Sequence, residues 1–300
     1  MQSLHALLGL GLLVAPLITA APLAAQPSAP GAADAPVILP RAVRHDFKSR
    51  VNGRDYRIQV AAPFQADPAR AYPVFYVLDG NWYFLAAAEN VTEAASTITP
   101  AIVVGIGYPT DDNDLVGHRR LFELTPTEGK VDWGRGGGGD AFLRVILEEV
   151  KPWVEVHYRV DAARQTLYGK SLGGLMVLRT LFRHPEAFQT YVAASPSIWW
   201  DDRVVLADEP ALARKVADGG LHVRVLVTSA EGEQYRGSDP KLLQESERFR
   251  AIENTSELAA RLAAMAPGSI QAQYAKFADE NHVSVSLASL GRAINFALKP

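Results

Sequence analysis

The segment best suited to chemistry is Gly169-Lys170-Ser171-Leu172-Gly173, which contains a GxSxG pattern. An apolar run, RQTLYGKS, leads into the pattern, and a helical stretch, LGGLMVLRTLFRHP, follows it. The serine therefore lies where a strand must turn sharply into a helix, and side chains on the two glycines would collide with their surroundings. This predicts a nucleophile elbow, in which the Ser171 hydroxyl attacks a carbonyl carbon and the N–H of Leu172 points at the oxyanion.

Two other interpretations of this segment need to be weighed. A buried serine in a glycine-rich turn would give the same pattern, and the chain contains 23 glycines. A phosphate-binding loop, GxxxxGK[ST], is excluded because it requires glycine where this chain has Arg164. The position between a strand and a helix favours the nucleophile.

A serine hydroxyl is a poor nucleophile near neutral pH, so it needs a general base and a carboxylate that orients the base. In the fold that carries this elbow, the chain order is serine, acid, histidine. Of the seven histidines, only His282 lies in a polar loop, DENH, between the last apolar run and the last helical stretch. We therefore predict that His282 is the general base.

The acid should follow the strand LHVRVLVTSA, where Glu231 and Glu233 are the two candidates. Glu233 is preferred because this fold commonly places its acid a few residues beyond the strand. Glu231 remains the alternate acid. A second oxyanion donor is expected from the loop DGNW after an earlier strand, where the N–H groups of Gly80, Asn81 and Trp82 are candidates and glycine would let the backbone approach a carbonyl.

Aromatic and basic residues near these loops could contact a substrate. Trp82, Trp199 and Trp200 could line an acyl or aromatic pocket, although tryptophan is equally common as a core anchor. Arg119 and Arg120 belong to a long polar segment, 108–139, which we expect to be a loop over the site. These arginines could meet anionic groups of a substrate, although loop arginines are mostly solvated.

The elements that must position these residues follow an α/β pattern. Extended stretches flank Asn52-Gly53, so residues 43–62 predict an antiparallel hairpin. From Tyr72 onward, short apolar runs alternate with helical stretches, which include a polar one near 240–266 and a last helix from about Val283 to Leu298. The sequence therefore predicts an α/β-hydrolase fold: a mostly parallel central sheet with helices on both faces and an N-terminal antiparallel hairpin.

The N-terminal residues predict export. Residues 1–25 form an apolar run that ends in small residues, which is typical of a signal peptide, and residues 26–40 form an Ala/Pro-rich tether. Residues 41–300 would then be one catalytic domain in the periplasm or outside the cell.

Composition excludes several classes of function. A net charge of −3 and a pI near 6.2 give no basic surface for nucleic acid. The chain has no cysteine, so disulfides and thiolate sites are excluded, and no metal or dinucleotide motif occurs. We expect a small-molecule ester as the partner, with no cofactor, no metal and no stable membrane insertion after signal cleavage. The sequence does not indicate the oligomeric state.

Several segments are similar to a known family: YPVFYVLDGNWYF, VGIGYP, RRLFELTP, LYGKSLGGLMVLRTLF and YVAASPSIWWDD. They resemble the putative-esterase (esterase D-like) family of α/β-hydrolases, especially the periplasmic siderophore esterases that open the trilactones enterobactin and salmochelin. The resemblance spans residues 43–298 and implies ester hydrolysis with Ser171 as nucleophile and His282 as base. Some siderophore esterases work with a Ser-His pair, and the loop here reads AEGEQ where relatives tend to read GELEQ, so the resemblance leaves the role of Glu233 open. The segment LFELTP also departs from the family, because it carries Glu123 where Asp is usual.

These observations predict an exported serine carboxylic ester hydrolase that acts through an acyl-enzyme, with a siderophore trilactone as the candidate substrate. A polysaccharide feruloyl or acetyl esterase, or a broad small-ester hydrolase, would use the same residues. A hydrolase-fold protein that binds a ligand without turning it over is the other alternative. Intact Ser171 and His282 argue against it.

Overall fold

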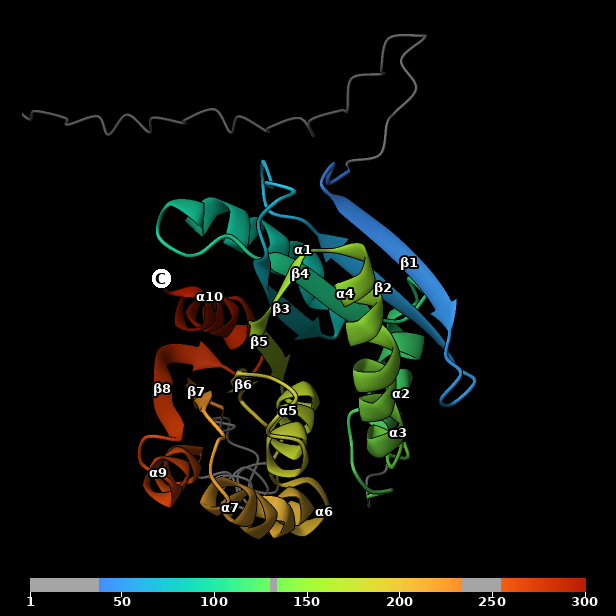
Figure 1. The fold of residues 1–300 in the computed structure, drawn as a ribbon. Coiled ribbons are helices and arrows are strands. Elements are labelled where there is room, and N and C mark those ends of the chain that lie inside the picture. The colour runs from blue at the N-terminus through green and yellow to red at the C-terminus, as the bar shows by residue number, and fades with distance from the viewer. Residues whose placement is uncertain (1–37, 130–133, 234–254) are drawn as a thin grey trace, which may run out of the picture. The chain divides into compact units, whose positions relative to one another are not determined.

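A computed structural model describes residues 38–129, 134–233 and 255–300, and their strands form one eight-stranded sheet (Figure 1). The strand order is β1-β2-β4-β3-β5-β6-β7-β8. The strands are β1 (Ala42–Lys48), β2 (Asp55–Ala61), β3 (Tyr72–Leu78), β4 (Ile102–Gly107), β5 (Val160–Lys170), β6 (Thr190–Ala194), β7 (Val223–Gly232) and β8 (Ile270–Asn281). Strands β3 to β8 pair in parallel, which confirms the mostly parallel sheet.

The N-terminal hairpin is also confirmed. Strands β1 and β2 pair antiparallel, from Ala42 opposite Ala61 to Lys48 opposite Asp55. The turn contains Gly53 at a φ of +71°, a backbone conformation that glycine adopts without strain. Strand β2 then joins the parallel part of the sheet through antiparallel pairing with β4.

Helices cover both faces of the sheet (Figure 1). The helices are α1 (Gly80–Glu93), α2 (Asn113–Glu123), α3 (Gly139–Val145), α4 (Lys151–His157), α5 (Leu172–Arg183), α6 (Trp200–Arg203), α7 (Glu209–Ala217), α9 (Thr255–Met265) and α10 (Val285–Leu298). Helices α1 and α10 pack against each other and against the central strands, whereas α5 packs on β5 and β6 together with α7. Because both faces are covered, central strand β3 is buried along its whole length.

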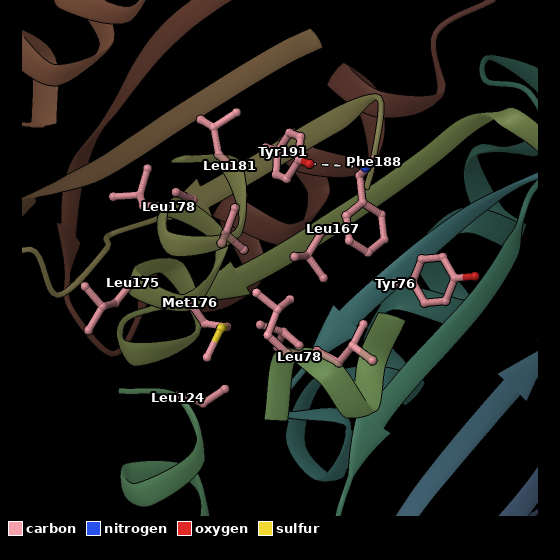
Figure 2. Packing of buried hydrophobic residues seen from close by; sticks show 14 of the residues in the cluster. Tyr76, Leu78, Leu124, Leu167, Leu175, Met176, Leu178, Leu181, Phe188 and Tyr191 are labelled. Atoms are coloured by element: carbon pink, nitrogen blue, oxygen red, sulfur yellow. Dashed lines mark hydrogen bonds between the residues drawn. The ribbon is translucent and has the colours of Figure 1, made fainter. Parts of the chain in front are cut away.

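Alternating side chains of the strands supply the two halves of the core. On the α5 face, Leu78 and Leu167 pack with Leu175 and Met176 of that helix (Figure 2). On the opposite face, the Tyr168 hydroxyl lies 3.2 Å from Ser289 Oγ of α10. The sheet therefore fixes the two helices that flank the elbow and the histidine loop.

The segment 108–139, predicted to be a loop, contains a helix, so that prediction is wrong for residues 113–123. Asp112 begins helix α2, because its Oδ1 accepts the N–H groups of Asp114 at 2.9 Å and Leu115 at 3.2 Å. Buried Val116 and Leu121 anchor the helix. An aspartate before spaced apolar residues is a helix-start signal. The many polar residues around this one are more typical of a loop, which is why the sequence pattern favours a loop here.

Some predictions fall on residues that the structure does not describe. These are the leader at 1–25, most of the tether at 26–40, and the start of the helical stretch expected near 240–266, of which α9 covers 255–265. Over the described ranges, no helix has the length and apolar character needed to cross a bilayer.

Helix α2 should depend on its cap. Replacing Asp112 with alanine removes the acceptor for two otherwise unpaired N–H groups, and we expect a loss of about 0.5–2 kcal/mol in the free energy of unfolding, measured by urea denaturation. Asp111→Ala is the control, because that exposed side chain makes only a 3.7 Å surface ion pair with Arg57. Equal losses in the two variants would contradict the capping role.

Candidate active site

Ser171 connects β5 to α5 in a strained conformation, with φ 59° and ψ −119°. No residue with a side chain fits at position 169, because a Cβ on Gly169 would lie 2.3 Å from the carbonyl oxygen of Gly173. Glycine is less strictly required at position 173 than the sequence suggested, because the nearest atom to a Cβ there would be a carboxylate oxygen of Asp79 at 3.3 Å. Close packing of β5 against the first turn of α5 thus holds Ser171 at the carboxyl edge of the sheet.

His282 lies in the loop between β8 and α10, and its Nε2 is 3.1 Å from Ser171 Oγ. The Oδ1 atom of Asn281 shapes this loop by accepting the N–H groups of Val283 at 2.8 Å and Ser284 at 3.0 Å. The two residues that the sequence named as nucleophile and base are therefore within hydrogen-bond distance. This geometry suits proton transfer from the hydroxyl to the imidazole.

Glu233 is near the histidine but is not hydrogen-bonded to it. Its Oε1 lies 3.9 Å from His282 Nδ1 and accepts the N–H of Ala230 at 2.9 Å. Glu231, the alternate acid, forms an ion pair with Lys276 at 3.0 Å. Of the two candidates, Glu233 is thus the one placed to attract a proton onto Nδ1, through charge rather than through a direct hydrogen bond.

The oxyanion donors can be compared through their backbone bonds. The N–H of Trp82 already donates to the carbonyl of Asp79 at 2.9 Å, which removes it from the candidates. Leu172 and Gly80 each begin a helix, and Asn81 is the second residue of α1, so their N–H groups have no acceptor within the helix. These three amides are the remaining candidates for binding a carbonyl oxygen that gains charge.

The loop Asp79-Gly80-Asn81-Trp82, called the oxyanion loop here, is held in place by contacts of Gly80 and Asn81 with the neighbouring backbone. A Cβ on Gly80 would lie 2.7 Å from the backbone nitrogen of Ile106, so glycine is needed there for contact with β4 rather than for the approach of a substrate carbonyl. The Asn81 side chain accepts the N–H of Tyr108 at 2.8 Å and donates to the carbonyls of Tyr108 and Thr110, each at 2.9 Å. It ties the start of α1 to the segment after β4.

Residues 49–278 match the family model described as "Putative esterase". The chain belongs to this family. It is 34% identical to the ferri-bacillibactin esterase BesA of Bacillus subtilis over 266 residues, and this alignment covers 85% of this chain and 88% of that protein. It is 31% identical over 296 residues to the siderophore enterobactin esterase of Emericella nidulans, covering 86% and 95% of the two chains. The BES protein from Bacillus cereus has a similar crystal structure, with a TM-score of 0.79 and 31% identity over 90% of this chain and 99% of that one. The protein is therefore an esterase of the α/β-hydrolase fold.

Arg120 of this esterase forms an ion pair with Asp79. Its Nε and Nη2 donate to the buried carboxylate of Asp79 at 2.9 and 3.1 Å, and its guanidinium lies 5.2 Å from the centre of the Trp82 ring. Asp79 has left-handed backbone geometry, φ 55° and ψ 45°, directly before the oxyanion loop. The sequence assigned Arg120 to the substrate, whereas the structure places it in an ion pair that holds this loop.

Arg119, the other arginine predicted to contact a substrate, lies against the N-terminal hairpin. Its Nη2 donates to buried Glu123 at 3.0 Å and to the carbonyl of Asp55 at 3.1 Å, and its guanidinium lies over the Tyr108 ring. Tyr56 donates to the same carboxylate at 3.0 Å. Burial raises the pKa of Glu123. This cluster fastens α2 to β2.

The three tryptophans differ in exposure. Trp200 is 0% exposed and donates from Nε1 to Thr127 Oγ1 at 3.1 Å, so it packs in the core, which is the second of the two roles considered for it. Trp199 is partly buried beside it. Trp82 is 40% exposed and remains accessible.

Sequence reasoning missed two residues next to the nucleophile. Ser197 Oγ lies 3.2 Å from Ser171 Oγ, a contact that nothing in the segment SPSIWW indicates beyond its resemblance to the family. Lys170 is buried at the end of β5. Burial and the charges of Lys170 and Arg120 lower the pKa of His282 to about 4, which keeps the imidazole neutral and able to accept a proton.

The pH dependence of kcat/KM should report this environment. A lowered histidine pKa keeps the base neutral in more acidic solution, so we expect the acid limb to lie well below pH 6.5, the ordinary value for histidine, towards pH 4. Lys170→Met removes a like charge and should move that limb to higher pH. The control is Lys215→Met, because Lys215 pairs with Glu186 on the surface. An acid limb that stays in place in Lys170→Met would contradict the effect of this charge.

Proposed function

We propose that this esterase hydrolyses the ester bonds of a siderophore trilactone, with Ser171 as nucleophile and His282 as general base. The observation that carries the proposal is the 3.1 Å contact between these residues in a chain that aligns with BesA over 85% of its length. The enterobactin esterase of Emericella nidulans, with a similar extent of alignment, supports the same substrate class.

The reaction would proceed through an acyl-enzyme. Ser171 Oγ attacks the ester carbonyl while its proton passes to His282 Nε2, and the N–H groups of Leu172 and of Gly80 or Asn81 stabilise the oxyanion. When the intermediate collapses, the imidazolium returns its proton to the departing alcohol. Water, deprotonated by His282, then attacks the acyl group and releases Ser171. Glu233 favours the tautomer of His282 that carries its proton on Nδ1.

The substrate class can be tested by incubating the purified protein with enterobactin, salmochelin and bacillibactin, with and without Fe(III), and following linear products by chromatography. We expect wild-type protein to open at least one trilactone and Ser171→Ala to lower kcat by a factor on the order of 10³ or more. Ser269→Ala is the control, because it lies before the start of β8, at the opposite edge of the sheet.

The other outcomes separate the alternatives. Turnover of p-nitrophenyl butyrate without any opening of the trilactones would retire the siderophore proposal and keep the esterase; feruloyl and acetyl oligosaccharides are the next substrates to try. Equal rates in wild type and Ser171→Ala would contradict the role of Ser171.

We also propose that residues 1–25 direct export to the periplasm or the medium. The support is their apolar composition and small C-terminal residues, which are typical of a cleaved leader. Intact mass spectrometry of protein from the periplasmic and culture fractions should find a chain that begins shortly after the leader. A full-length chain confined to the cytoplasm would contradict export.

A further inference from the structure

The hydroxyl of Ser197 has an unusual position for a residue with no assigned role. Its side chain is buried, with only 2% of the residue exposed, and its Oγ lies 3.2 Å from Ser171 Oγ. The backbone fixes this contact, because the N–H of Ser197 donates to the carbonyl of Ser171 at 3.1 Å. The same segment packs on the first turn of α5, where a Cβ on Gly174 would lie 2.9 Å from Pro196 Cα. Backbone contacts therefore place Ser197 beside the nucleophile.

The hydrogen bonds around Ser171 can be counted proton by proton. Each serine hydroxyl has one proton to donate and can also accept. The nearby charge of Glu233, 3.9 Å from Nδ1, favours the tautomer of His282 whose Nε2 accepts. Ser171 then gives its only proton to His282. Within the described part of the chain, Ser171 Oγ is the one side-chain partner of Ser197 Oγ, so the Ser197 proton must point towards Ser171.

We infer that Ser197 is a further catalytic residue, whose hydroxyl donates a hydrogen bond to Ser171 Oγ as that atom gains negative charge. The inference rests on the proposed role of Ser171 as nucleophile. During acylation, the Ser171 proton moves to His282 Nε2, the Oγ–carbon bond forms, and the carbonyl electron pair moves to its oxygen. The Ser197 proton stays on Ser197 throughout and stabilises the oxygen that is losing its proton.

The same bond would assist the second half of the reaction. In the acyl-enzyme, Ser171 Oγ is an ester oxygen without a proton, and it becomes the leaving group when water attacks. It then gains charge before His282 returns a proton to it. A donor on Ser197 favours that step as well, so both acylation and deacylation should benefit.

The opposite proton arrangement would reverse the effect. If Ser171 donated to Ser197, the hydroxyl would be turned away from its base, and removing Ser197 would free the nucleophile and speed the reaction. The sign of the change in rate therefore distinguishes a donor from a competing acceptor.

Ser195 provides a matched control two residues away. It is also buried, at 1% exposed, but its Oγ has no hydrogen-bond partner among the residues that the structure describes. Ser197→Ala and Ser195→Ala each remove one buried hydroxyl from the same loop, and only the first removes a contact with the nucleophile. Thermal unfolding of both variants checks that any loss of activity is not a loss of folded protein.

The test measures the second-order rate of phosphonylation by a fluorophosphonate, together with kcat and KM for p-nitrophenyl butyrate. We expect Ser197→Ala to lower the phosphonylation rate and kcat by about 3- to 10-fold, the effect of one hydrogen bond, with KM unchanged. Ser195→Ala should match wild type in all three.

Three results would overturn the inference: an unchanged rate in Ser197→Ala, a faster one, or an equal loss in Ser195→Ala. Its failure is distinguishable from that of the proposed function. If wild-type protein is not phosphonylated on Ser171, the nucleophile is wrong; if wild type and Ser197→Ala are labelled equally fast, only the role of Ser197 fails. The siderophore assays do not enter this comparison.

Discussion

The site depends on one long-range contact, between Ser171 Oγ and His282 Nε2, which joins residues 111 positions apart. Their strands, β5 and β8, are not neighbours, because β6 and β7 lie between them. Three inter-strand spacings amount to roughly 14 Å, so the histidine cannot reach the serine by simply following its own strand. Strand β8 is irregular at its end, where the register with β7 shifts and Asp279 adopts a φ of 59°. The sheet supplies the common edge, and the bend in β8 brings the imidazole back across it.

Burial and positive charge around this contact favour the neutral imidazole of His282, the form that the proposed mechanism uses as the base. Lys170 and Arg120 both lower the pKa of His282, and burial acts in the same direction. The same positive charges favour an oxyanion that forms beside them. Glu233 lies too far from His282 Nδ1 for a hydrogen bond, so its influence is electrostatic. The site therefore resembles a Ser-His pair with a nearby carboxylate more than a fully hydrogen-bonded triad.

Helix α2 connects strand β2 to Asp79, the residue directly before Gly80. Successive residues on a helix point about 100° apart, so Arg119 and Arg120 contact different parts of the protein. Arg119 joins Glu123 and β2, and Arg120 joins Asp79 before the oxyanion loop. Removing either partner of the Arg120–Asp79 pair would leave the other charge buried without compensation, so the pair fixes α2 against the residue that precedes Gly80.

Features that depend on local pattern and chain order could be predicted from the sequence. Asn52-Gly53 indicated the hairpin, strand-turn-helix context at GxSxG indicated Ser171 as the candidate nucleophile, and the polar loop before the last helix indicated His282 as the candidate base, because each signal lies within a few residues. The partners of large side chains with polar ends depend on the tertiary structure. Arg119, Arg120 and Trp200 have donors that can serve a substrate or the scaffold, and only the fold shows that Glu123, Asp79 and Thr127 occupy them. It also decided that Ser197 touches the nucleophile, since that contact requires the end of β6 to pack on the elbow, and no spacing along the chain encodes the distance between two neighbouring strands.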